Sequence, residues 1–324
     1  MKPLILTSAP HIKSKSTLQQ IMYDVALALA PVSAWSIYLF GWKSVVVIVT
    51  AIASGLVFEA AALKIQKKAQ IMKTVFDGSA IVTSLLLALN MPPASPIWLT
   101  ITGSFVAIII GKHTFGGLGY NIFNPALVAR VFLLISFPMQ MTRWISPNGF
   151  NSEEITVATP LDVLKVSGLQ KMQESFNMND LFNGYSTGSL GEMSELLLLI
   201  GAAYLFFRKV ITWEIPVSML LGLFLFTGAF YLVDPLKYAS PFFHMVTGGA
   251  ILGAFFMATD MVTSPITRKG MLIFGAMTGI ITGIIRILGS YPEGVSFAII
   301  MMNAFVPLID RYTKVIKIGS DKKR

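Results

Sequence analysis

The stretch "DGSAIVTSLLLALNM", residues 77–91, aligns without gaps with "TGGAILGAFFMATDM", residues 247–261. This internal similarity indicates how the chain is organised. The aligned identical pairs are Gly78 with Gly248, Ala80 with Ala250, Ile81 with Ile251, Ala88 with Ala258 and Met91 with Met261. Asn90 falls opposite Asp260. The alternative is chance similarity between two apolar helices rich in glycine and alanine.

The composition around these copies is that of a membrane protein. The chain has 324 residues, of which 54% are hydrophobic and 13% charged, with a mean hydropathy of +0.70. A soluble protein carries roughly 25% charged residues. Apolar runs long enough to cross a hydrocarbon core of about 30 Å recur along the chain. The sequence therefore predicts an all-α polytopic membrane protein with about ten spans, at roughly 21–41, 44–63, 74–90, 96–111, 124–138, 194–208, 214–233, 241–258, 270–288 and 294–311.

The two copies lie in the third and the eighth predicted spans, so they cross the membrane in opposite directions. This is the arrangement of an inverted repeat of five spans plus five, which many transport folds use. We expect a first repeat over 1–138, a polar connector over 139–193, a second repeat over 194–311 and a basic tail over 312–324. Lys and Arg concentrate on the side of the termini, so the positive-inside rule predicts cytoplasmic termini and an extracytoplasmic connector.

Composition also limits the chemistry. The chain has no cysteine, which excludes disulfides and cysteine-ligated iron–sulfur clusters within it. The three histidines, His11, His113 and His244, are far apart in the sequence, and we expect no metal site. The net charge of +9 is explained by topology, with lipid and not nucleic acid as the partner.

Glycine and asparagine are concentrated in "GKHTFGGLGYNIFNPALVAR", residues 111–130. Gly117 permits a close approach of the backbone to a ligand. Asn121 and Asn124 can bind a polar cofactor group or cap a short helix starting at Pro125. The alternative is a re-entrant loop with capping asparagines and no ligand.

Charged residues at membrane depth are costly, so each is a functional candidate. Glu59 and Asp77 are the best candidates for an ion path, and Asp260 is a candidate contact for a cation or cofactor. The alternative is that these carboxylates lie near helix ends and reach the interface. From these residues alone, a transporter or a channel is as well supported as any other function.

Three stretches carry a family resemblance: "GGLGYNIFNPALVARVFLLISFP", "ATDMVTSP" and "GSYPEGVSFAIIMMNAFVPLID". They resemble the RnfD-type membrane subunits of Rnf electron-transport complexes and, more distantly, the NqrB-type subunits of the sodium-pumping NADH:quinone reductase. The resemblance runs along nearly the whole chain, with span count and loop placement agreeing. It implies a ten-span fold of two inverted halves.

The resemblance also implies a covalent FMN, joined to a threonine hydroxyl through a phosphoester that a flavin transferase makes. The family's attachment motif falls on residues 153–159, where Thr159 is the acceptor, Thr156 the supporting hydroxyl and Ala158 a matching position. Glu153 stands where the family has Asp, and Val157 stands where it has Gly. The alternative is that "TVATPLDVL" only caps a helix.

By the same resemblance, the chain is expected to be an electron relay within a complex of several subunits. Such complexes pass electrons between reduced ferredoxin and NAD, coupled to translocation of sodium ions or protons. The chain is then one part of an oxidoreductase and carries no catalytic side chain of its own; a second, noncovalent flavin such as riboflavin stays open. Two alternatives remain: a stand-alone transporter or channel without flavin, and an NqrB-type subunit of the reductase.

Overall fold

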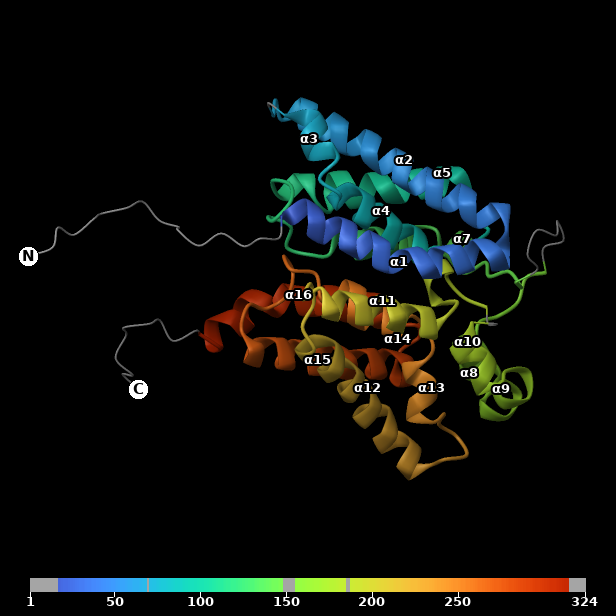
Figure 1. Ribbon diagram of the computed structural model, residues 1–324. Helices are drawn as coiled ribbons and strands as arrows, with labels where there is room; N and C mark the ends of the chain where they lie inside the picture. The colour runs from blue at the N-terminus through green and yellow to red at the C-terminus, as the bar shows by residue number, and fades with distance from the viewer. Residues whose placement is uncertain (1–16, 69, 148–154, 185–186, 315–324) are drawn as a thin grey trace, which may run out of the picture.

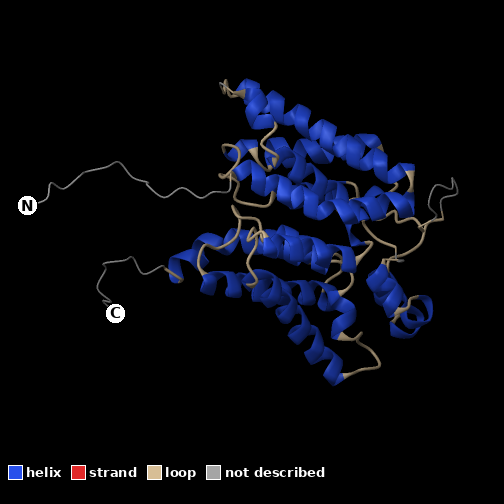
Figure 2. Ribbon diagram, viewed as in Figure 1, coloured by secondary structure: helices blue, strands red, loops and turns tan. Residues whose placement is uncertain are grey.

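The computed structural model describes residues 17–68, 70–147, 155–184 and 187–314. The described residues form helices joined by loops, and they contain no β-strand beyond one isolated bridge (Figure 2). Glu153 and much of the basic tail lie outside the described residues. The prediction of an all-α polytopic membrane protein is confirmed.

Helical segments occur at every one of the predicted spans. Those of the first half are α1 (Leu18–Phe40), α2 (Trp42–Ile65), α3 (Ile71–Val75), α4 (Ser79–Leu89), α5 (Ile97–Phe105), η1 (Val106–Ile110), η2 (His113–Phe115), α6 (Pro125–Ser136) and α7 (Pro138–Met141). The connector holds α8 (Pro160–Ser167), α9 (Leu169–Ser175), α10 (Met178–Asn183) and η3 (Leu190–Glu192). Those of the second half are α11 (Glu195–Phe207), α12 (Glu214–Val233), α13 (Pro241–Met245), α14 (Ala250–Leu252), η4 (Gly253–Met257), α15 (Arg268–Leu288) and α16 (Val295–Tyr312).

Seven helical segments in the described part of the chain are long and apolar enough to cross a membrane. Two shorter apolar helices, α6 and α11, and the interrupted segment from α13 to η4 occupy the remaining predicted spans. Short and interrupted helices are tolerated at membrane depth only where protein or a water-filled cavity covers their ends.

The two copies of the repeat are both interrupted at the aligned glycine. Gly78 has φ +91° where α4 begins, and Gly248 has φ +62° just before α14. Only glycine adopts such angles without strain, so the shared glycine marks a shared break. The break at Gly248 is closed by Arg286 of α15, which donates to the carbonyls of Thr247 and Gly248 at 2.8 and 2.9 Å. The carbonyls of Thr247 and Gly248 at this break are therefore paired.

The helix bundle has two distinct ends (Figure 1). The start of α1 and the end of α16 lie at one end, which we call the termini end; α8, α9 and α10 lie at the other, the connector end. Met91 follows α4 and accepts a hydrogen bond from Leu190 of η3, while Asp260 follows η4 and lines a cavity with Leu18. The two aligned segments therefore run in opposite directions, and an inverted repeat of five spans plus five stays a prediction.

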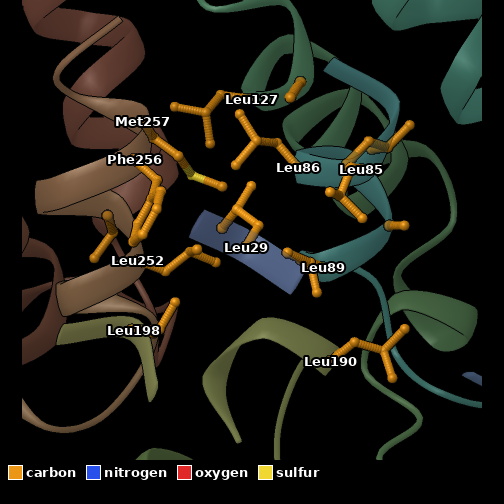
Figure 3. Close-up of a cluster of buried hydrophobic side chains, with 14 of the residues drawn as sticks. Leu29, Leu85, Leu86, Leu89, Leu127, Leu190, Leu198, Leu252, Phe256 and Met257 are labelled. Carbon is orange, nitrogen blue, oxygen red and sulfur yellow. The ribbon is translucent and has the colours of Figure 1, made fainter. Parts of the chain in front are cut away.

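The two halves meet in one apolar core. Side chains from both halves, among them Leu29, Leu86, Leu127, Leu252 and Phe256, point toward one another in Figure 3. α1 packs against α11, and α6 packs against α16. The approach of α1 and α11 is close at Gly201, where a Cβ would lie 2.2 Å from the Ala28 carbonyl oxygen.

Candidate functional site

A cavity of about 300 Å³ lies between the halves at the termini end. Its lining includes Gly119, Asn121 and Asn124 from the first half and Asp260 from the second. Leu18, the first residue of α1, also lines the cavity, which shows that the cavity lies at the termini end of the bundle. The structure thus brings Asp260 together with Asn121 and Asn124, two candidates that are far from it in the sequence.

Asn124 has the capping role that the sequence predicts. Its side-chain oxygen accepts from the amides of Ala126 and Leu127 at 3.1 and 3.4 Å, and Pro125 is the first residue of α6. Its amide nitrogen donates to the carbonyl of Met257 at 3.1 Å. Met257 ends the π-helical turn η4, and such turns are frequent at functional sites. Asn124 therefore ties the two halves together at the cavity wall.

Asp260 lies at the cavity, after the end of η4. Its carboxylate accepts from the Thr263 hydroxyl at 3.0 Å. Burial raises the pKa of Asp260, while hydrogen bonds from Thr263, Val262 and Asn121 lower it in part. A buried carboxylate beside two asparagine amides can pair with a donor on a polar ligand or with a cation.

Glu59 and Asp77 belong to one polar network beside this cavity. Glu59 pairs with Lys112 at 2.8 and 2.9 Å and with His113 Nε2 at 2.9 Å. Lys112 Nζ also donates to Ser79 Oγ at 2.8 Å, and Ser79 donates to Asp77 through its amide and hydroxyl. Both Lys112 and Ser79 line the cavity, so the network reaches its wall.

Sequence reasoning missed Lys112 and Ser79. Lys112 is 2% exposed, and it follows an apolar span and precedes His113. A lysine at the end of an apolar span usually reaches the interface, so the sequence gives no sign that this one turns inward. Gly117 has φ +99° but does not line the cavity; a Cβ there would contact only His113.

Thr159 lies at the connector end and is the N-cap of α8. Its hydroxyl accepts from the Asp162 amide at 3.1 Å and donates to the Asp162 carboxylate at 2.7 Å. The hydroxyl and carboxylate form a capping box, so the capping interpretation of this stretch holds. The side chain is 5% exposed and lines a small pocket with Glu192 and Glu293.

The residues before Thr159 hold its loop in place. Thr156 and Ala158 are exposed, and Thr156 forms an isolated bridge with Ile145. The carbonyl of Ala158 accepts from the Thr187 hydroxyl at 2.8 Å. Residues 155–159 therefore contact segments from both ends of the connector, with the side chains of Thr156 and Ala158 open to solvent.

A group of charged side chains lies beside the small pocket that Thr159 lines. Arg130 donates to Asn90 at 2.6 Å and pairs with Glu293, and its guanidinium is 3.7 Å from Glu192. Burial, followed by the charge of Glu293, raises the pKa of Glu192 to about 7. Arg130 lies within the short apolar helix α6, and these partners compensate its charge.

These features define a polytopic, all-helical membrane protein with one candidate site at each end of its bundle. The chain belongs to the NQR2, RnfD, RnfE family, whose model matches residues 5–319. It is 42% identical to the D subunit of the proton-translocating ferredoxin:NAD(+) oxidoreductase complex of Clostridium ljungdahlii, over 97% of this chain and 96% of that protein. It is 43% identical to the D subunit of the Na(+)-translocating ferredoxin:NAD(+) oxidoreductase complex of Acetobacterium woodii, over 99% and 98% of the two chains. The D subunit of the ion-translocating oxidoreductase complex of Stutzerimonas stutzeri is 42% identical, over 95% and 94%.

Proposed function

We propose that this chain is the RnfD-type membrane subunit of an Rnf complex. In this proposal it relays electrons through a covalent FMN on Thr159 while the complex transfers electrons between ferredoxin and NAD. The observation that carries the proposal is near-full-length similarity to D subunits of ion-translocating ferredoxin:NAD(+) oxidoreductase complexes, together with the match to the NQR2, RnfD, RnfE family. One of these relatives is named for protons and another for sodium ions, so either ion fits the proposal.

The residues around Thr159 fit a phosphoester. The hydroxyl lies at the start of α8, where unpaired amides and the helix dipole favour a phosphate. Asp162 orients the hydroxyl and accepts its hydrogen. The Asp162 carboxylate must turn away from an attached phosphate. Thr156 and Ala158, which precede Thr159, are exposed and therefore accessible to a flavin transferase. When bound, FMN supplies the transfer of one or two electrons.

The cavity at the termini end fits a second, noncovalent flavin such as riboflavin. Asn121 and Asn124 offer amides that can pair with the edge of a flavin ring, and Asp260 can accept from a ribityl hydroxyl. The apolar side chains of the same lining can cover the ring. α1 has 23 residues, so about 35 Å separates the two ends of the bundle. Two flavin sites at opposite ends would serve a relay across the membrane.

For the ion, we propose a path that begins at the polar network of Glu59 and Asp77 and includes Asp260. These carboxylates lie at or beside the cavity, as an ion path that meets a flavin would need. The excess of Lys and Arg that the sequence has on the side of the termini supports cytoplasmic termini in the cell membrane, with Thr159 on the outer side. The other Rnf subunits are then the partners that bring and remove electrons.

The test is to purify the complex from cells that contain the transferase, then measure the intact mass and the in-gel fluorescence of this chain under denaturing conditions. We expect a fluorescent chain with the added mass of FMN, and Thr159→Ala to abolish both signals. Thr156→Ala tests the supporting hydroxyl and is expected to weaken the signals without moving the attachment site.

An unmodified, non-fluorescent wild-type chain would contradict the proposal and favour a stand-alone transporter. Co-purification with quinone reductase subunits in place of Rnf subunits would favour an NqrB-type role.

A further inference from the structure

A second cavity of about 300 Å³ lies at the connector end, between α8, the loop after α12, and the ends of α13 and α15. Four basic side chains line it: Lys165, Lys237, His244 and Arg286. No carboxylate of the described residues is part of this lining. We call it the basic pocket; Leu161 alone belongs both to it and to the small pocket at Thr159.

Two of the basic side chains are buried with a nitrogen left over. His244 is 4% exposed and Arg286 is 6% exposed. Within the described part of the structure, His244 Nδ1 and Arg286 Nε have no hydrogen-bond partner, although the other Arg286 nitrogens donate to backbone carbonyls. A buried polar atom without a partner is unfavourable, and a ligand whose acceptors reached these nitrogens would remove that cost.

The two lysines supply positive charge that solvent can reach, because both side chains are exposed. Arg286 interacts electrostatically with Glu293, Glu192 and Glu195. The Lys165 ammonium donates to the carbonyls of Arg286 and Tyr291, at 3.5 and 2.8 Å, and Lys237 lies over the Tyr238 ring, 5.3 Å from its centroid. Burial lowers the pKa of Lys165, and the nearby Asp162 carboxylate raises it in part. An anion in the pocket would pair with both ammonium groups.

Exposed apolar side chains precede the pocket residue Lys237 in the sequence. Leu236, next to Lys237, is 88% exposed, and Leu232 and Val233 at the end of α12 are 82% and 83% exposed. α12 is one of the membrane-spanning candidates, so these side chains lie where acyl chains meet headgroups. An exposed apolar surface beside a basic pocket is the pattern of a lipid headgroup site.

We propose that the basic pocket binds the phosphate of an anionic phospholipid, whose acyl chains lie along the exposed end of α12. The lipid would hold α8, which carries Thr159 at its start, against the second half of the chain. A free phosphate ion offers the same chemistry without the acyl chains, so the test must separate the two sources.

The experiment uses the whole complex, delipidated in detergent, and measures bound phospholipid by native mass spectrometry together with the thermal unfolding midpoint. The probes are phosphatidylglycerol, phosphatidylcholine and inorganic phosphate. We expect only phosphatidylglycerol to bind at micromolar concentration and to raise the midpoint. In the double variant Lys165→Gln/Lys237→Gln its affinity should fall about 30-fold, from the loss of two charges near the surface. The exposed Lys171 on α9 does not line the pocket, so Lys171→Gln is the matched control and should bind as the wild type does.

Equal binding of the two lipids, or an unchanged affinity in the double variant, would overturn the proposal. Displacement of the effect by inorganic phosphate alone would assign the pocket to a soluble anion and overturn the lipid. A Thr159→Ala complex must bind phosphatidylglycerol as the wild type does; loss of binding there would assign the pocket to the flavin.

Discussion

The buried pair of Glu59 and Lys112 makes the most informative prediction about stability. Both side chains are 2% exposed, and Nζ lies 2.8 and 2.9 Å from the two carboxylate oxygens. Removing one partner of a buried pair leaves an uncompensated charge and costs about 3–5 kcal/mol. Replacing both partners with neutral groups of similar size costs far less. We therefore expect Lys112→Met to destabilise the protein strongly and Glu59→Gln/Lys112→Met to recover most of the loss.

His113 limits the size of this effect, because it is the other partner of Glu59, at 2.9 Å, and still contacts the carboxylate when Lys112 is replaced. For a cost of about 4 kcal/mol, the unfolding midpoint of Lys112→Met should fall by on the order of 10 °C.

The assay is a thermal unfolding scan of the wild type, Lys112→Met and the double variant in detergent. Lys73 is an exposed lysine at the end of α3, so Lys73→Met is the control and should shift the midpoint by less than about 2 °C. If the double variant is as unstable as Lys112→Met, the side chains act through packing, and the argument from an uncompensated charge is wrong.

Three further predictions rest on other contacts. A Cβ on Gly279 would lie 2.0 Å from the Met219 carbonyl oxygen, so Gly279→Ala should separate α15 from α12 and cost about 2–4 kcal/mol in thermal scans; Gly228→Ala, with its nearest contact at 3.4 Å, should be nearly neutral. Asn124→Ala should cost about 1–2 kcal/mol in stability through loss of the α6 cap. Asn124→Asp keeps the cap and should lose only the hydrogen bond to Met257 and any flavin bound in the cavity. The flavin is measured as the noncovalent flavin that the protein releases on denaturation. Because the pKa of Glu192 is raised to about 7 in the folded protein, its stabilising contribution is present below about pH 4.5 and is lost as the pH rises through 7. Glu192→Gln should therefore gain stability relative to the wild type between pH 5 and pH 8, by at most about 3 kcal/mol, and an unchanged difference across that range would contradict this reasoning.

Much of the membrane fold was predictable because its signals are local. Long apolar runs predict where the spans lie, and the structure has helical segments at those positions. The glycine that the two aligned segments share marks a break in each of them. The caps at Asn124 and Thr159 were predictable for the same reason, since a cap depends on a polar side chain directly before Pro at the first helical position.

The arrangement of the candidate sites depended on the tertiary structure. Asn121 and Asp260 come from different halves and meet only because the folded halves enclose one cavity between them. Lys112 joins Glu59 to Ser79, and its inward turn depends on the carboxylate that α2 presents. The basic pocket likewise joins α8 to α13 and α15. The sequence alone indicates which segments are apolar enough to span the membrane and where α6 and α8 begin, because those signals come from neighbouring residues. The pairing of the charges and the grouping of side chains around each cavity follow from the tertiary structure, because burial and Coulomb energy depend on distances between segments that are far apart in the sequence.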